Sequence, residues 1–142
     1  PYGRGFSPVQ WQILEGKKKI TVSLIEAQKS IDTGDIFLQR NISFKGTELY
    51  DEIRSKQANA TIQLIKKFAK NYPNYKRTKQ KGKVTYYPKR TPKDSKLDIN
   101  KTILNNFNLL RINNNNSWPS FFIYKKKKYI LKIYNEKKKA IF

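Results

Sequence analysis

The sequence predicts an α/β fold followed by a small appendage of one helix and a β-hairpin. Two segments with a helical hydrophobic period flank two runs rich in β-branched residues, and the last third adds one more helical segment and two strand-like runs. The 142 residues are 37% hydrophobic and 13% aromatic, which is enough for a packed core.

Residues 8–15 ("PVQWQILE") are the first predicted helix. We expect Ser7 to cap this helix, because Pro8 suits the first helical position and Gly16 ends the amphipathic pattern. Residues 20–26 and 35–44 alternate in β-branched and apolar side chains and therefore predict two strands.

A long helix is predicted from a cap at Thr47 to Pro73. Acidic residues lie in its first turn and lysines in its last turn, as the helix dipole favours. Its apolar stripe consists of Leu49, Ile53, Ala60, Leu64 and Phe68. Residues 73–93 then read as a basic linker, so that we expect one region over residues 1–72 and a second over residues 94–142.

The second region contains a predicted helix over residues 99–112 and a predicted hairpin formed by residues 120–125 and 128–134. Two arginines in this part of the chain have two interpretations: they contact phosphate, or they pair with nearby aspartates. We favour pairing of Arg90 and Arg111 with Asp94 and Asp98, since exposed Arg–Asp contacts are common.

The composition excludes several chemistries. The chain has no Cys and no His, so that it contains no disulfide, no thiolate or imidazole metal ligand and no Ser-His triad; we expect no metal cofactor. No apolar run approaches the roughly 20 residues of a membrane span, and the first residues do not resemble a signal peptide. We expect a cytoplasmic protein.

The net charge of +21 is unevenly distributed. Residues 66–93 hold eleven basic and no acidic side chains, and residues 125–139 hold eight basic side chains against one acidic side chain. Such runs suit a phosphate-rich ligand. They lack the interleaved aromatic and Arg residues of a base-stacking surface, and we therefore interpret them as solvated surface.

The candidate for chemistry is the loop "AQKSIDTGDIF", which contains Asp32 directly after a predicted strand. Gly34 allows a tight turn there and close approach of the backbone to a ligand. An Asp in such a turn is by itself common, and a purely structural role for Asp32 is the alternative interpretation.

Four segments resemble the folate-dependent formyltransferase family. "PYGRGFSP" is similar to the end of its His-x-Ser-Leu-Leu-Pro-x-x-Arg-Gly-x-x-Pro segment, and "SIDTGDI" is similar to its Asp-Thr-Gly-Asp loop. "PKRTPKDSKLD" and "LLRINNNNSWPSFF" resemble its downstream region. The resemblance implies that residues 1–72 are the carboxy-terminal part of a Rossmann-like catalytic domain, and that the Asn-x-His half precedes Pro1.

The resemblance also implies roles for particular residues. Members of this family transfer the formyl group of 10-formyltetrahydrofolate, their co-substrate, to an amine. Asp32 matches the Asp that holds and polarises the catalytic His, and residues that match the folate pocket are Pro1, Gln28, Lys29, Ser30, Ile31 and Asp32 itself. Without the His we expect these 142 residues alone to be inactive.

Two acceptors within the family compete. The first is the amine of a nucleotide-linked amino sugar, as in the biosynthesis of surface polysaccharide, and the second is initiator methionyl-tRNA. Methionyl-tRNA enzymes carry a larger carboxy-terminal barrel, whereas only about fifty residues follow the "RTPKDSKLD" segment here. We therefore favour the sugar enzyme, which leaves the sugar and its nucleotide open.

A different class of function is a non-enzymatic basic module that binds nucleic acid. Asp32 would then be only a turn residue, and binding would weaken steeply with salt. For the enzyme we do not expect nucleic acid as a partner. A homodimer is a further expectation, because a sheet without its first strands exposes an edge.

Overall fold

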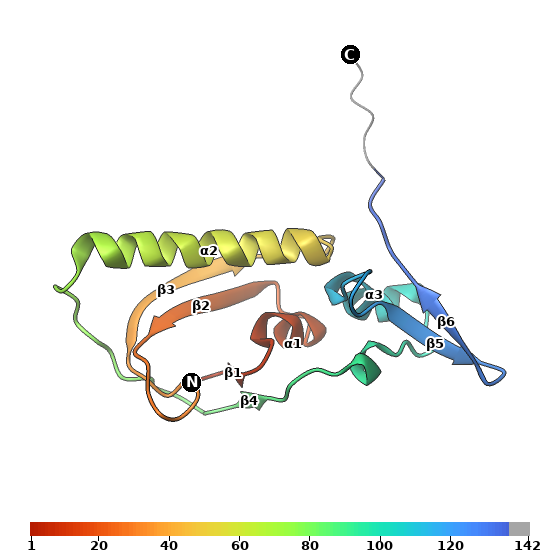
Figure 1. Cartoon of the computed structure of the whole chain (residues 1–142), viewed down its shortest axis with the longest axis horizontal. Helices are drawn as coiled ribbons and strands as arrows, with labels where there is room; N and C mark the ends of the chain where they lie inside the picture. Colours follow the sequence, from red (N-terminus) through yellow and green to blue (C-terminus); the bar gives the residue numbers. More distant parts are fainter. Residues whose placement is uncertain (137–142) are drawn as a thin grey trace, which may run out of the picture.

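Two antiparallel strands and a long helix form the first region of the structure, a computed structural model that describes residues 1–136 (Figure 1). Strand β2 (Lys19–Ile25) pairs with β3 (Ile36–Ser43), in a register that matches Ile20 with Ile42. Helix α2 (Tyr50–Asn71) packs against both strands. The alternating pattern of the two strands thus places one set of side chains against the helix, and the predicted strands are confirmed.

The core lies between this sheet, helix α2 and a shorter helix. Helix α1 (Pro8–Leu14) contributes Val9 and Ile13, and helix α3 (Ile103–Ile112) reaches the same core through Ile112. Burial of each such aliphatic side chain contributes roughly 1.5–3 kcal/mol. The core is completed by Ile20, Ile42, Phe44, Ile53 and Ala60.

The predicted helices are confirmed, and Ser7 occupies the predicted N-cap position before Pro8, but the predicted cap at Thr47 is wrong. Ser7 has a φ of 50°, and its side chain makes no capping hydrogen bond. Helix α2 begins at Tyr50 rather than directly after Thr47, with Leu49 in the capping position. The backbone N–H of Leu49 instead donates to the Glu52 carboxylate at 2.9 Å, so that an acid inside the first turn satisfies the free N–H group.

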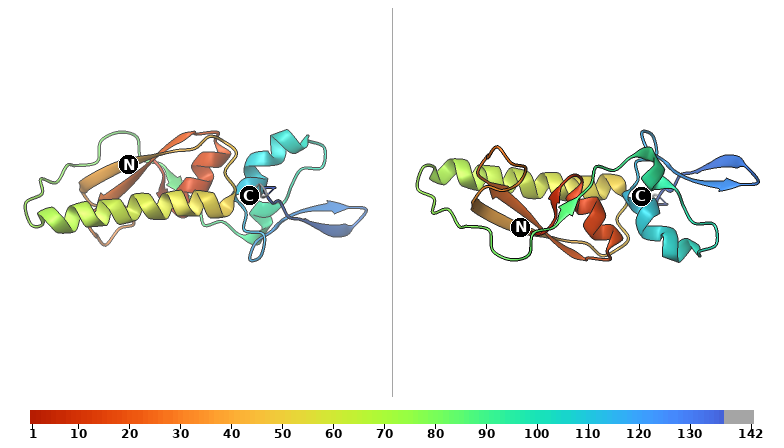
Figure 2. Two further views of the ribbon diagram at one scale, coloured as in Figure 1. Left: turned by 90° about the horizontal axis from the view of Figure 1, so that it is seen from above. Right: turned by 90° about the horizontal axis from the view of Figure 1, so that it is seen from below.

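The predicted basic linker lies along the first region. Its strand β4 (Tyr86–Tyr87) pairs in parallel with β1 (Arg4–Gly5), and Thr78 exchanges backbone hydrogen bonds of 2.8 and 2.9 Å with Ile36. Views from above and below show this stretch running back past the amino terminus (Figure 2). The boundaries at residues 72 and 94 remain a prediction.

The second region contains the predicted helix and hairpin. After a short 3₁₀ helix η1 (Pro92–Ser95), α3 starts at Ile103, four residues later than predicted, because the Thr102 hydroxyl caps it at Asn105 N–H, 3.2 Å away. Strands β5 (Ser120–Tyr124) and β6 (Lys127–Leu131) form the hairpin. The end of the predicted range 94–142 lies outside the described residues.

Candidate active site

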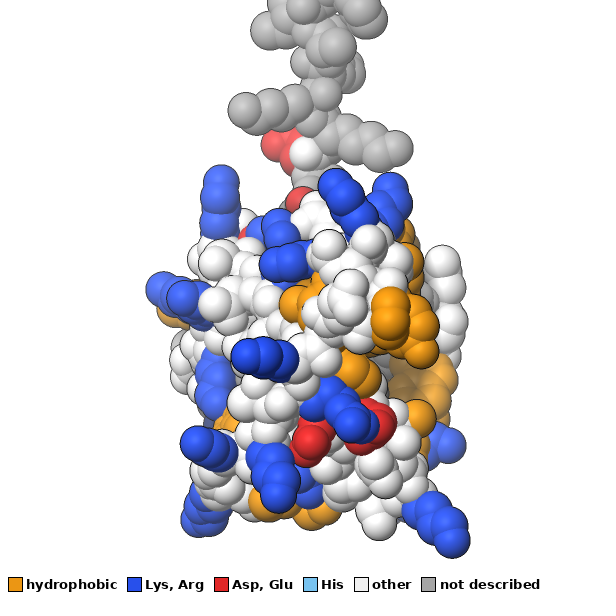
Figure 3. Space-filling model, turned by 90° about the vertical axis from the view of Figure 1, so that its left-hand side faces the viewer, with side chains coloured by type: hydrophobic (Ala, Val, Ile, Leu, Met, Phe, Trp, Pro, Cys, Tyr) orange, Lys and Arg blue, Asp and Glu red, His pale blue; other side chains and the backbone are white. Residues whose placement is uncertain are grey.

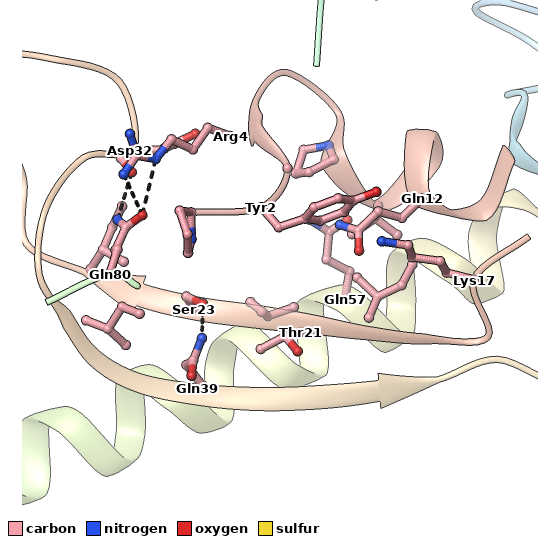
Figure 4. Close-up of a pocket in the computed structure, with 18 of the residues that line it drawn as sticks. Tyr2, Arg4, Gln12, Lys17, Thr21, Ser23, Asp32, Gln39, Gln57 and Gln80 are labelled. Atoms are coloured by element: carbon pink, nitrogen blue, oxygen red, sulfur yellow. Dashed lines mark hydrogen bonds between the residues drawn. The ribbon is translucent and has the colours of Figure 1, made fainter. Parts of the chain in front are cut away.

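Asp32 occupies the loop between β2 and β3. Its φ of 55° is left-handed, a conformation that Asp tolerates better than most residues. Its Oδ2 atom accepts a hydrogen bond from the backbone N–H of Gly5, 2.8 Å away (Figure 4 places Asp32 beside Arg4 and Gln80). The start of the chain and the loop after β2 are thus joined through this carboxylate.

Gly34 sets the position of the same loop. A Cβ atom built at Gly34 would lie 1.8 Å from the carbonyl oxygen of Glu26, which no side chain can tolerate. The backbone of the loop therefore passes directly against the end of β2. This close approach is the physical reason for the glycine two residues after Asp32.

Gln80 fastens the loop from the other side. Its Nε2 atom donates to the carbonyl oxygens of Asp32 at 2.8 Å and Gly34 at 2.7 Å. Its Oε1 atom accepts from the Arg4 guanidinium, at 2.7 Å from Nη2 and 3.2 Å from Nε. Sequence reasoning missed Gln80, because a single amide within a lysine-rich stretch carries no periodic signal.

A cavity of about 480 Å³ runs from Asp32 along β2 (Figure 4). Its volume lies within the range of small-molecule sites. Polar side chains from helices α1 and α2 and from strands β2 and β3 line it. Among the described lining residues, Asp32 is the one with an acidic side chain. These polar side chains include Gln12, Lys17, Thr21, Ser23, Gln39, Gln57 and Gln80.

The predicted folate-contacting residues fall into two groups. Pro1 and Asp32 line the cavity, whereas Gln28, Lys29, Ser30 and Ile31 are exposed and do not line it. The Ser30 carbonyl accepts a 3.0 Å hydrogen bond from the Thr33 hydroxyl, which fixes the turn over residues 30–33. The assignment of all six positions to a folate pocket remains a prediction.

Within residues 1–136, no three His, Cys, Asp or Glu side chains are grouped so that they could hold a metal ion. None of the helices described is long and apolar enough to cross a membrane.

The comparisons with known proteins point to one family. No protein-family model matches the chain. Methionyl-tRNA formyltransferase from Thermodesulfovibrio yellowstonii is 30% identical over 130 residues, which are 89% of this chain and 41% of that protein. The structure of methionyl-tRNA formyltransferase from Clostridium thermocellum is 27% identical, with a TM-score of 0.76 over 96% of this chain and 60% of that chain. The chain is homologous to formyltransferases.

This homology covers only part of a formyltransferase, since the chain spans about two fifths of the length of the curated relatives it matches. The fold also matches a 4-N formyltransferase from Francisella tularensis, with a TM-score of 0.80 at 23% identity, over 96% of this chain and 59% of that chain. The predicted α/β fold and the family resemblance are therefore confirmed. A sugar N-formyltransferase from Shewanella sp. FDAARGOS_354 also matches, with a TM-score of 0.77 at 18% identity over 98% of this chain and 59% of that chain. The matches thus include both methionyl-tRNA and sugar formyltransferases, so that they do not determine the acceptor.

Proposed function

We propose that this chain is the part of a formyltransferase that carries the catalytic carboxylate, Asp32, and takes part in formyl transfer from 10-formyltetrahydrofolate to an amine. One observation carries the proposal. The Asp32 carboxylate lies at a cavity of small-molecule size, is held by a backbone N–H group and has no cation within 4 Å among residues 1–136.

In the proposed reaction the amine nitrogen attacks the formyl carbon, a C–N bond forms, and the carbonyl electron pair moves to oxygen. The resulting oxyanion collapses, the bond to the folate N10 breaks, N10 takes up a proton and the amine loses one. A carboxylate beside an imidazole raises the pKa of the imidazole and fixes the orientation of its ring. Asp32 would in this way keep an imidazolium charged while the oxyanion exists.

The sequence has no His, and we propose that the imidazole and its neighbouring amide belong to a part of the protein outside these 142 residues. Pro1 and the backbone of residues 28–31 would contact the folate. Purified residues 1–142 should then show no formyl transfer when supplied with 10-formyltetrahydrofolate and an acceptor amine. Detectable turnover by this chain alone would contradict the proposed division of the site.

For the acceptor we propose the amine of a nucleotide-linked amino sugar. Solved structures of sugar N-formyltransferases that share this fold support the choice, among them the enzyme from Shewanella sp. FDAARGOS_354, with a TM-score of 0.77. Methionyl-tRNA is the second candidate, favoured by the name of the 30%-identical relatives and by the net charge of +21.

The test uses the protein that contains this chain together with its Asn-x-His segment. Transfer of labelled formyl groups is measured to a panel of nucleotide-linked amino sugars and, separately, to methionyl-tRNA. Turnover with a sugar alone supports the proposal, turnover with methionyl-tRNA alone supports the second candidate, and turnover with neither contradicts both.

The alternative function, a nucleic-acid-binding module, predicts a surface on which basic side chains are gathered. Figure 3 shows Lys and Arg side chains scattered over one end of the molecule and separated by polar, hydrophobic and acidic side chains. Arg77 pairs with Glu26. RNA affinity that falls steeply with the logarithm of salt concentration, together with no formyl transfer, would favour the module.

A further inference from the structure

Two arginines are buried where the two regions of the chain meet, and they differ in how their charge is balanced. Arg111 is 3% exposed; its Nη1 atom lies 3.9 Å from the Glu48 carboxylate and donates to the Glu48 carbonyl at 3.2 Å. Arg90 is 7% exposed and has no carboxylate within 4 Å in the described part of the chain. The predicted pairing of Arg111 with Asp98 is therefore wrong.

Arg90 lies with its Cζ atom 5.9 Å from the centre of the Trp11 ring, and its hydrogen bonds go to neutral oxygens. Its Nη2 atom donates to the Asp94 carbonyl at 3.1 Å and to Asn113 Oδ1 at 3.0 Å, and its buried Nε has no partner. The Asp94 carboxylate instead accepts from Thr91, at 2.5 Å from the backbone N–H and 2.9 Å from the hydroxyl. Arg90 thus bonds the backbone of Asp94 and not its carboxylate, contrary to the predicted ion pair.

Burial lowers the pKa of Arg90, and the Asp94 charge only partly opposes this effect. A buried cation without a hydrogen-bonded counter-charge is costly, so that such groups are normally paired. The contrast with Arg111 shows that the fold can supply a carboxylate at this junction. At Arg90 it supplies a cavity instead.

This cavity has a volume of about 200 Å³ and shares no lining residue with the cavity at Asp32. Among residues 1–136, Arg90 is the one cation that lines this cavity, and no acidic side chain lines it. Three hydroxyl groups line it, and none of them makes a hydrogen bond among residues 1–136; they belong to Ser7, Tyr50 and Ser117. The lining is completed by Gln10, Ile112, Asn113, Asn114 and Trp118.

We propose that this cavity binds a phosphate group. A guanidinium with unused N–H donors and several free hydroxyls match the donor pattern that a tetrahedral dianion requires, and the bound dianion would balance the buried charge of Arg90. The phosphate is either inorganic phosphate or the phosphate of an ester. The site does not depend on the proposed formyl transfer.

The test is equilibrium dialysis of the full chain with radiolabelled inorganic phosphate at fixed ionic strength. We expect one saturable site. Arg90→Gln should weaken binding at least tenfold, because it removes the charge and most donors, and Ser117→Ala should weaken it two- to fivefold. The matched control is Lys89→Gln, which removes the same charge from the exposed neighbouring position and should change affinity less than twofold.

Equal weakening by Arg90→Gln and Lys89→Gln, or binding without saturation, would overturn the proposal, since it would show diffuse attraction by the basic surface. Circular dichroism checks that each variant is folded. If Arg90→Gln does not fold, the phosphate affinities of Ser117→Ala and Ser7→Ala replace it as the test. Unchanged affinity in both variants overturns the proposal that this cavity binds phosphate. Ribose 5-phosphate distinguishes the sources: competition stronger than that of inorganic phosphate assigns the site to an ester, and weaker competition assigns it to free phosphate.

Discussion

Two carboxylates, each close to a glycine in a loop, differ in their burial and in the number of hydrogen bonds that they accept. Glu48 is 5% exposed and accepts from the backbone N–H groups of Lys45 and Gly46, at 2.8 and 3.0 Å. It also binds Lys56 Nζ at 2.5 Å and lies beside Arg111. Asp32 is half-buried and accepts one backbone hydrogen bond, from Gly5.

The two carboxylates therefore differ in how many further hydrogen bonds each can accept. An ionised carboxylate can accept about four hydrogen bonds. The oxygens of Glu48 accept from two backbone N–H groups of the β3–α2 loop and from Lys56 of helix α2. Arg111 of helix α3 lies 3.9 Å from the same carboxylate, so that its charge balances the buried arginine where the two regions meet. Asp32 keeps an unoccupied oxygen at a cavity, and a carboxylate of that kind can orient another group.

The largest expected effect is on stability, at Glu48. Glu48→Ala leaves Arg111 buried without a counter-charge and two backbone N–H groups without an acceptor, and we expect a loss of about 3–5 kcal/mol in the free energy of unfolding. Urea denaturation measures it. Asp51→Ala, which removes an exposed acid from the first turn of α2, is the control and should change the stability by less than about 1 kcal/mol. A loss equal to that of the control would mean that Glu48 does not hold the junction.

Asp32→Asn tests whether the carboxylate at the cavity is catalytic. In the protein with its complete catalytic region, turnover should fall about a hundredfold or more, because the charge that supports the imidazolium is lost. Folate binding and the melting temperature should change little, since Asn keeps the size of the side chain and tolerates the same turn.

Asp35→Asn is the matched control, and it should retain turnover. Near-normal turnover in Asp32→Asn, with unchanged melting, would show that Asp32 is not catalytic. An equal loss of stability and activity would indicate a structural turn residue.

Acid should remove the stability that the Glu48 carboxylate contributes to the fold. Burial raises the pKa of Glu48, but hydrogen bonds from Lys56 and from the backbone of Lys45 and Gly46 outweigh burial and hold it at about 2. A folded-state pKa below the ordinary 4.5 stabilises the fold above that pH, and this stability is lost as the pH falls toward 2. By pH 3 the loss is about 2 kcal/mol.

The measurement is the difference in unfolding free energy between the wild type and Glu48→Gln from pH 7 to pH 3. Glu48→Gln cannot titrate, so that the difference should shrink as the pH falls. A difference that stays constant over this range would show that the pKa of Glu48 is not lowered by folding.

The smallest effect is expected at Gln80. Gln80→Ala removes the hydrogen bonds to the carbonyls of Asp32 and Gly34 at a partly exposed site, and the expected loss of stability is about 1 kcal/mol by thermal denaturation. Lys79→Ala, an exposed neighbour, is the control. Turnover of the complete enzyme should fall modestly, because the loop of Asp32 loses one of its supports. An unchanged melting temperature and turnover would show that Gln80 does not position the loop.

The sequence by itself determined the local elements of this protein. The alternation in residues 20–26 and 35–44, the helical period after residue 49 and the hairpin near residue 125 were all predicted, because they reflect the backbone geometry and the side-chain period of each element. The turn at Asp32 and Gly34 was predicted for the same reason, since glycine there records a close backbone approach.

Only the tertiary structure decided which residues meet. Gln80 lies 48 positions from Asp32, and Arg111 lies 63 positions from Glu48; neither pairing leaves a pattern in the local sequence. The cap predicted at Thr47 was wrong for a related reason, because the helix begins at Tyr50 and the Glu52 carboxylate accepts from the free N–H group of Leu49 in the folded chain. Hydrogen bonds and ion pairs depend on distances that packing fixes, whereas hydrophobic period depends only on the order of the residues.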